Sequence, residues 1–402
     1  MKETKKPAVR FHGFSNEWEQ YKVGELIEDY TEKTIVQNQY PVLTSSQQQG
    51  IVRQEEYFAD RQVTTNDNIG YFVLPFGYFT YRSRSDTDVF VFNRNDLIDK
   101  GIISYYYPVF VPKACDSNFL LRRLNYGIRK QLSMAAEGTG QKVLAHGKFK
   151  DMIVDVPAKE EQIKIGSIFE DIDNLITHRQ SKLEKLQDLK ASMLEKMFPK
   201  DGADVPEIRF RGFSRVWKTI CLKDITSEIT RTDKTSYAPI MMITAASGFI
   251  DQADRYSFDN AGHSLAKYIV LKKGELAYNH GASKLRPYGS CFALEVDEAR
   301  IPYVYHCFTI SDHNPYFISR VLNNKGIEKQ LRRLVTSGAR MDGLLNISYE
   351  EYTTIKIQLP EKDEQDKIVA YFKNIENLID FSQQELNKLQ SIKKVLLEKM
   401  FV

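Results

Sequence analysis

Hydrophobic residues recur at alternating steps of four and three in two long stretches of the sequence, residues 165–197 and 368–400. A 3.5-residue period held over almost five heptads is the pattern of a coiled-coil seam. Residues 167–198 and 368–401 contain no glycine or proline, so each stretch is predicted to form one helix of about 40 residues and about 60 Å. The apolar seam positions are Ile165, Phe169, Ile172, Ile176, Leu183, Leu186, Met193, Met197, Ile368, Phe372, Ile375, Ile379, Leu386, Leu389, Leu396 and Met400.

Each of these helices needs a partner, because a rod this long does not pack inside a globular domain of this size. The simplest partner for one predicted helix is the other. Polar residues at two seam positions near mid-helix, Arg179 and Ser382, can set the register. Of the two possible orientations we favour the antiparallel one over the parallel one, because a duplicated unit closes most simply on itself about a twofold axis.

The sequence repeats one plan twice. Arg10-Phe11, Gly13-Phe14-Ser15 and Trp18 recur 199 residues later, ending at Trp217. Residues 157–198 recur 203 residues later as 360–401, with 22 of 42 positions identical. We therefore predict a pseudo-twofold tandem repeat in which each copy has a variable globular segment followed by a helical segment.

The globular segments are predicted to be mixed α/β (α+β). Short β-rich runs lie at residues 69–75, 89–92, 102–111, 268–271, 290–296 and 301–310, and helices are predicted at 119–136 and 315–334. A Pro/Gly/Asp-rich linker at 199–206 separates the two copies. The predicted domains are residues 1–155 and 201–358, with helical spacers at 156–200 and 359–402.

The composition excludes several classes of protein. Lys+Arg 56 against Asp+Glu 53 gives a formal charge of +3, which excludes a uniformly basic nucleic-acid binder but permits local basic patches. The four cysteines form no CxxC pair, so we expect free thiols, with neither a zinc site nor a disulfide framework. The sequence has no signal-peptide pattern and no apolar run of about 18 residues, and we expect a cytoplasmic protein.

Catalytic motifs are absent from the sequence, including HExxH, GxxxxGK[ST] and GxSxG. Residues 137–142 lack the spacing of a phosphate loop and are interpreted as a glycine turn. Asn314-Pro315-Tyr316-Phe317 is similar to the Asn-Pro-Pro-aromatic motif of amino-methyltransferases but lacks the second proline, so it is interpreted as a helix start. The seven histidines have no metal-ligand spacing. We expect no catalytic site, no metal site and no cofactor bound by this chain.

Basic and polar residues beside aromatic ones are the candidate nucleic-acid contacts. Arginine pairs with guanine and with phosphate, and the amides of Asn and Gln suit adenine. In both copies a tyrosine and polar or basic residues follow a glycine, Gly77 or Gly274, but the loop residues differ. This favours two modules that read different sequences, although any single residue could instead be solubilising surface charge. The candidates are Tyr81, Arg82, Ser83, Arg84, Arg122, Arg123, Arg129, Lys130, Asn279, His280, Lys284, Arg286, Arg332, Arg333 and Arg340.

The chain as a whole resembles the specificity (S) subunit of type I restriction-modification systems. The resemblance is carried by the opening motif PxxRFxGFSxxW at residues 7–18 and 206–217. It is also carried by a Glu-Gln-x-Lys-Ile stretch that leads into a helix ending Leu-Glu-Lys-Met-Phe, at residues 161–198 and 364–401. It extends from end to end of the chain, in the order recognition domain, helix, recognition domain, helix.

The resemblance implies a non-catalytic DNA-binding subunit. Each recognition domain would read one half of a bipartite site in double-stranded DNA, and the antiparallel helices would set the spacing. Two adenine methyltransferase (modification) subunits would dock on the chain, and restriction subunits would add ATP-dependent translocase and nuclease activity. S-adenosylmethionine, ATP and Mg²⁺ would be used by those partners. No membrane partner is implied.

Two other interpretations of the sequence remain open. One is a coiled-coil adaptor that binds only protein, in which case the basic loops are incidental. The other is a stand-alone, two-headed DNA-binding regulator.

Overall fold

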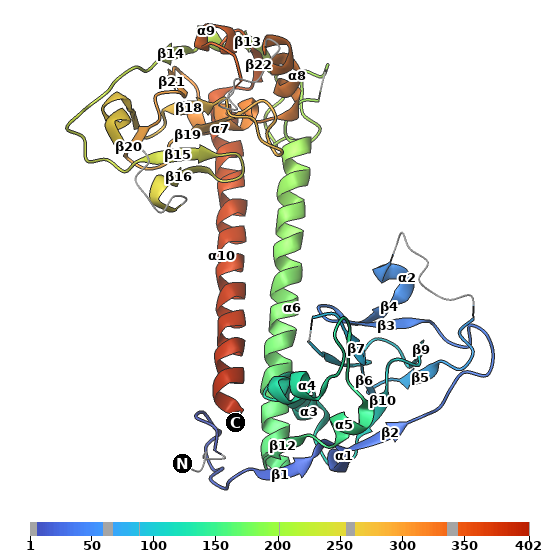
Figure 1. Ribbon diagram of the computed structural model, residues 1–402. Coiled ribbons are helices and arrows are strands. Elements are labelled where there is room, and N and C mark those ends of the chain that lie inside the picture. The colour runs from blue at the N-terminus through green and yellow to red at the C-terminus, as the bar shows by residue number, and fades with distance from the viewer. Residues whose placement is uncertain are drawn as a thin grey trace. The chain divides into compact units, whose positions relative to one another are not determined.

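The computed structural model of this protein describes residues 6–58, 67–87, 89–200, 202–254, 262–335 and 345–401 (Figure 1). The chain divides into two compact units. Unit 1 comprises residues 1–181 together with 383–402, and unit 2 comprises residues 182–382. The long helices α6 (Lys159–Lys196) and α10 (Lys362–Met400) each contribute residues to both units.

Unit 1 has a four-stranded antiparallel sheet in the order β2-β10-β6-β8. Two-stranded ladders pair β1 with β12, β3 with β4, β5 with β9 and β7 with β11. The elements are β1 (Glu19–Lys22), α1 (Val23–Leu26), β2 (Ile27–Tyr30), β3 (Leu43–Ser46), β4 (Gly50–Arg53), α2 (Gln54–Tyr57), β5 (Phe72–Pro75), β6 (Phe79–Tyr81), β7 (Arg84–Ser85), β8 (Phe92–Arg94), β9 (Lys100–Ile103), β10 (Val109–Pro112), α3 (Ser117–Asn125), α4 (Arg129–Ala135), β11 (Lys142–Val143), α5 (His146–Lys150) and β12 (Ile153–Val156).

Unit 2 has the corresponding sheet in the order β14-β21-β18-β19. Its ladders pair β13 with β22, β15 with β16 and β17 with β20, so three of the four ladders of unit 1 recur among the described residues, and the pair β7-β11 does not. The elements are β13 (Lys218–Cys221), η1 (Leu222–Asp224), β14 (Thr226–Glu228), β15 (Met241–Thr244), β16 (Gly248–Asp251), η2 (Gln252–Asp254), η3 (Gly262–Lys267), β17 (Ile269–Lys272), β18 (Leu276–Asn279), β19 (Ser290–Ala293), β20 (Glu298–Ile301), β21 (His306–Ile310), α7 (Pro315–Leu322), α8 (Lys325–Leu334), α9 (Tyr349–Tyr352) and β22 (Lys356–Leu359).

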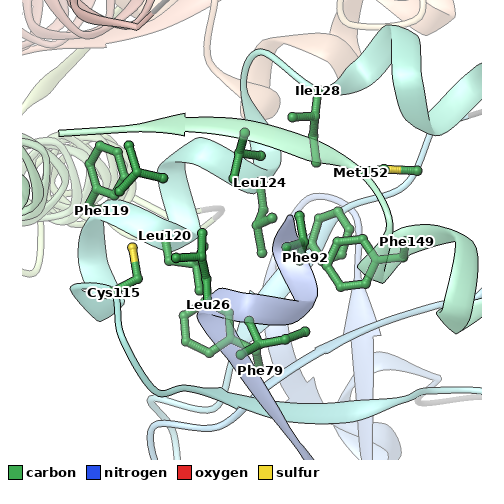
Figure 2. Close-up of a cluster of buried hydrophobic side chains, with 14 of the residues drawn as sticks. Leu26, Phe79, Phe92, Cys115, Phe119, Leu120, Leu124, Ile128, Phe149 and Met152 are labelled. Atoms are coloured by element: carbon green, nitrogen blue, oxygen red, sulfur yellow. The ribbon is translucent and has the colours of Figure 1, made fainter. Parts of the chain in front are cut away.

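The core of unit 1 lies between its sheet and α3. Alternate residues of β6 and β8, such as Phe79 and Phe92, turn to one face, where Phe92 stacks on Phe149 of α5 (Figure 2). The amphipathic helix α3 adds Phe119, Leu120 and Leu124 to the same cluster, and its first turn is capped by Asp116, which accepts from the Phe119 amide. The sheet and the helix therefore share one hydrophobic core, as an α+β layer structure requires.

The two long helices run antiparallel inside each unit. In unit 1, Asp173 of α6 pairs with Lys393 of α10, and Arg179 pairs with Glu385, so residue numbers rise along one helix as they fall along the other. In unit 2, Lys190 pairs with Glu376 in the same sense. All sixteen predicted apolar seam residues are buried or half-buried. The mixed helix and strand fold with two long helices is confirmed, while the pseudo-twofold relation between the units stays a prediction.

The structure corrects the lengths of several predicted elements. The helices predicted at 119–136 and 315–334 are each two helices, α3 with α4 and α7 with α8. Gly127 interrupts the first of them with a φ of 97°, a left-handed conformation that ends a helix. The β-rich runs 102–111 and 301–310 are likewise divided, because β9 and β10 belong to different sheets, as do β20 and β21. The segments between them form turns in which Tyr105, Tyr106 and Tyr303 are exposed.

Asn314 begins a helix, as predicted. Its side chain accepts from the backbone amides of Tyr316 and Phe317, and Pro315 stands in the first turn of α7, where no backbone donor is needed. In the described ranges no group of three or more His, Cys, Asp or Glu residues is arranged to hold a metal ion. No helix in those ranges is long and apolar enough to cross a bilayer.

Candidate nucleic-acid interface

A cleft of about 780 Å³ with mixed polar and apolar walls lies in unit 1 beside the turns that follow β3, β6 and β9. Two of the predicted contacts, Arg82 and Arg84, line it. Amides, hydroxyls and aromatic rings make up most of the remaining wall, and these are the groups that pair with base edges or stack on bases. They include Ser45, Ser46, Gln47, Gln48, Gln54, Tyr57, Tyr71, Tyr105, Tyr106, Tyr107 and Gln141.

The turn between β3 and β4 forms one rim of this cleft. Ser46 Oγ accepts from the backbone amides of Gln48 and Gln49, each at 3.2 Å. Asn93 of β8 holds the turn from below, since its Nδ2 donates to Ser45 Oγ at 2.7 Å and to the Ser46 carbonyl at 2.8 Å. The turn is thus fixed to the central sheet while residues 47–49 stay exposed.

The turn between β9 and β10 forms the facing part of the wall. The Tyr106 carbonyl accepts from the Ser83 backbone amide at 3.2 Å and from Ser83 Oγ at 2.7 Å. The Arg84 guanidinium lies over the Tyr106 ring, 4.1 Å from its centroid, which is a cation–π contact. These contacts tie the predicted segment Arg82–Arg84 to the tyrosine turn. Ser83 therefore has a structural role, and Arg84 is oriented by a stacked ring.

The four candidates at 81–84 differ in exposure. Arg82 is exposed and has no ion-pair or hydrogen-bond partner in the described part of the chain, so it is free to meet a phosphate or a base. Tyr81 is fully buried, and its hydroxyl lies 3.3 Å from His146 Nδ1. Burial raises the pKa of Tyr81. The prediction that Tyr81 contacts DNA finds no support, because its side chain belongs to the core.

Arg122 and Arg123 are also engaged within the protein. Arg122 of α3 pairs with Asp173 of α6, and the same carboxylate receives Lys393 of α10 at 2.6 Å. Arg123 is 2% exposed and lies 3.3 Å from Asp155. Burial lowers the pKa of Arg123, and the nearby Asp155 opposes that shift. Both arginines are held by acids of the protein, and their contact with DNA stays a prediction.

Arg129 and Lys130 open α4 and are exposed, without ion-pair partners among the residues that the structure describes. In unit 2, three basic residues are likewise exposed and have no ion-pair partner among the described residues: Lys284, and Arg332 and Arg333 in the last turn of α8. Their placement suits contact with phosphates. Arg340 lies outside the described residues.

His280 and Asn279 of unit 2 are tied to the backbone. His280 is buried, and its two ring nitrogens lie 2.7 Å from the Leu345 carbonyl and 2.8 Å from the Val304 carbonyl. The Asn279 amide donates to the Ile243 carbonyl at 3.1 Å. Their predicted base contacts are therefore not supported.

Arg286 is half-buried in unit 2 and donates to the Asn323 carbonyl, and burial lowers its pKa. With Lys284 it belongs to the exposed loop between β18 and β19. In this loop Arg286 is thus bound to the protein backbone, whereas Lys284 is exposed and has no ion-pair partner among the described residues.

Sequence reasoning missed the amide turn and the tyrosine turn of unit 1. Both leave a visible signal, three glutamines in a row at 47–49 and three tyrosines in a row at 105–107. Neither run is basic, so a search for basic clusters passed over them. The β-bridge between Val42 and Ile102 links the two ladders that carry these turns, and the sequence pattern does not specify it.

Known proteins resemble this chain in sequence and in fold. Residues 15–187 match the family described as type I restriction modification DNA specificity domain. The type I restriction enzyme MjaVIII specificity subunit of Methanocaldococcus jannaschii is 23% identical over 299 residues, which are 66% of this chain and 65% of that protein. The chain thus spans just under two thirds of the length of this curated relative.

The fold has a solved counterpart. The crystal structure of the type I restriction-modification system S subunit from M. genitalium superposes with a TM-score of 0.59 and 13% sequence identity, covering 99% of each chain. At that identity the likeness concerns the fold. Together, the matched domain at residues 15–187, the relative from Methanocaldococcus jannaschii and this shared fold make the chain similar to type I restriction-modification specificity subunits.

Proposed function

We propose that this protein is the DNA-specificity subunit of a type I restriction-modification complex, and that the globular part of each unit reads one half of a bipartite site. One observation carries the proposal. The β3–β4 hairpin of unit 1 and the β15–β16 hairpin of unit 2 share the same strand pairing and a glycine at φ 72°, Gly50 or Gly248. The turn residues differ completely, Gln47-Gln48-Gln49 against Ala245-Ala246-Ser247. A constant frame with variable turns suits two readers of different sequences.

The charges support binding to a duplex. The net charge is only +3, yet exposed cations without protein partners in the described ranges stand on both units, such as Arg82 and Lys130 in one and Lys284 and Arg333 in the other. Such cations replace counterions on phosphates, so affinity falls steeply with salt. Base contacts then add specificity at about 1–3 kcal/mol for each good bidentate pair.

The chemistry belongs to partner subunits in this proposal. Two adenine methyltransferase subunits dock on the specificity subunit and use S-adenosylmethionine, and restriction subunits use ATP and Mg²⁺ to translocate and cleave DNA. This chain supplies recognition and spacing and catalyses nothing. Linking two modest readers on one stiff element raises the effective concentration of the second reader once the first has bound.

Methylome sequencing tests the proposal. A host expressing this chain with its cognate methyltransferase is expected to carry methyladenine in one bipartite, asymmetric motif that is absent without this chain. Filter binding of the purified complex to that motif should weaken steeply between low and moderate salt. Methylation without a bipartite motif, or a complex that binds no DNA, would instead favour the protein-only adaptor. Specific binding by the chain alone, with no methyltransferase required, would favour the stand-alone regulator.

A further inference from the structure

The two units differ in the side chains that lie under corresponding turns, the β3–β4 turn of unit 1 and the β15–β16 turn of unit 2. We propose that unit 1 reads A·T pairs with the amides of Gln48, which lines its cleft, and of Gln49 next to it, whereas unit 2 reads its half-site from the loop that carries Lys284 and Arg286. This inference rests on the proposed function and deepens it. It assigns the reading of bases to Gln48 and Gln49 in unit 1. It predicts that the corresponding turn of unit 2, residues 245–247, does not read bases.

The amide turn of unit 1 is preorganised for reading bases. The Gln48 and Gln49 backbone amides are satisfied by Ser46, and Asn93 anchors Ser45 and Ser46 to the sheet. The side-chain amides of Gln48 and Gln49 are exposed and form no hydrogen bond to the described residues. A glutamine amide offers a donor and an acceptor together, which match N7 and N6 of adenine in the major groove. Because the backbone of the turn is already fixed, binding costs the side-chain entropy of the two glutamines but not the entropy of ordering a loop.

The facing wall completes the reading surface. Arg84 is stacked on Tyr106, and the Tyr106 carbonyl is held by Ser83, so the guanidinium has a defined position. Arg82 beside it is exposed and unpaired within the described ranges. Both arginines line the same cleft as Gln47 and Gln48. The cleft therefore presents both amide and guanidinium groups.

In unit 2 a different side chain lies under the corresponding turn. Phe292 of β19 occupies the position that corresponds to Asn93 of β8, because each is paired with the middle of its neighbouring strand, Ala277 or Thr80. A Cβ added at Gly248 would lie 3.0 Å from the Phe292 ring, so this ring packs directly under the turn. The turn residues Ala245-Ala246-Ser247 carry no amide side chain. The exposed loop that follows β18 is then the nearby segment that offers basic side chains for recognition.

A turn graft tests the inference in the assembled complex. The graft gives unit 1 the turn sequence of unit 2 through Gln47→Ala, Gln48→Ala and Gln49→Ser together. The β15–β16 hairpin of unit 2, which has the same strand pairing, already carries this turn sequence. Methylome sequencing of a host expressing the variant with its methyltransferase should show one half-site relaxed at one or more A·T positions. We expect about a 5- to 150-fold loss of preference there, with the spacer and the other half-site unchanged. Gln48→Ala alone, which keeps every backbone hydrogen bond of the turn, should relax a subset of those positions.

Two matched variants serve as controls. Lys284→Ala in unit 2 should alter only the half-site that the graft leaves intact. Gln384→Ala, an exposed amide on α10, should alter neither. If the wild-type complex methylates a bipartite motif but the graft and Gln48→Ala leave both half-sites unchanged, this inference is wrong and the proposed function stands. Relaxation of both half-sites by the graft also overturns it. A wild-type complex with no bipartite motif overturns the proposed function itself.

Discussion

Two buried ion pairs explain the arginine of the repeated opening motif. Arg10 donates from Nε and Nη2 to Glu161 at 2.6 and 2.7 Å, and Arg209 binds Glu364 in the same bidentate way at 2.7 Å. Both glutamates are 0% exposed. The hydrogen bond from Arg10 to Glu161 raises the pKa of Arg10 even though burial opposes it. The motif therefore fastens the start of each globular segment to the first turn of a long helix.

Removing one of these arginines should destabilise the protein strongly. Arg10→Ala leaves Glu161 buried without its partner, and we expect a loss of about 3–5 kcal/mol in the free energy of unfolding. Chemical denaturation followed by circular dichroism measures it. Arg215→Ala is the control, since Arg215 and its partner Glu361 are both exposed and the change should be small. Equal losses in the two variants would show that the buried pair has no special role.

At the residue scale the sequence does not distinguish an arginine that is available to bind DNA from one that is paired with an acid inside the protein. Arg82 and Arg122 each stand in a basic cluster, yet Arg82 has no partner among the described residues whereas Arg122 lies against Asp173. The deciding acid lies 51 residues away along the chain. Such a pairing depends on how α3 packs on α6, and local composition does not contain that information.

At the scale of elements, the same three-charge network joins each recognition segment to both long helices. In unit 1, Asp173 of α6 receives Arg122 and Lys393. In unit 2, Glu376 of α10 receives Arg320 of α7 at 2.8 Å and Lys190 of α6 at 2.9 Å. One carboxylate thus connects three helices in each unit.

The pH dependence of stability should report on the Glu376 network. Burial alone would raise the pKa of Glu376, but hydrogen bonds from Arg320 and Lys190 outweigh it and hold the pKa below its ordinary value of 4.5. A lowered pKa in the folded state means that the carboxylate stabilises the protein above about pH 4.5 and that this contribution is lost as the pH falls further. Glu376→Gln should cost about 1.5–3 kcal/mol at pH 7 and much less near pH 3.5.

Urea denaturation at the two pH values checks this expectation. Glu295→Gln is the matched control, because the Glu295 pair with Lys373 is exposed. A cost for Glu376→Gln that does not shrink in acid would contradict the network as its source.

The long helices were the most predictable elements, because a 3.5-residue period over many turns has few alternative explanations. Their contacts with the globular segments were not predictable. Gly166 is an example, since a Cβ there would lie 2.6 Å from Asp116 Oδ1 and 2.8 Å from Asn118 Cβ. The close approach of α3 to α6 requires glycine at this point, whereas the matching position in α10 is Val369.

For the whole molecule, the proposed spacing role gives a measurable length. A heptad inserted after Thr177 in α6 and another after Asn387 in α10 would keep both seams in phase and preserve antiparallel pairing. Seven residues add about 10.5 Å of helix, or about three base pairs of B-DNA. Methylome sequencing should show a spacer about three base pairs longer between unchanged half-sites.

A heptad inserted in α6 alone is the control for that experiment. It leaves seven residues without a partner on α10 and should abolish or weaken methylation. An active double insertion with the original spacer would refute the spacing role.

The division of unit 1 between the two ends of the described chain affects how the protein is made. Phe401 packs against Trp18, Phe119 and Phe169, so this aromatic cluster needs a residue that is synthesised after all of unit 2. Unit 2 has all of its residues once Ser382 has been added. At about 5–20 residues per second, the first 181 residues wait roughly 10–40 s for their closing segment. The unit whose synthesis starts first is therefore completed second, and during that interval its unfinished aromatic surface is open to chaperones.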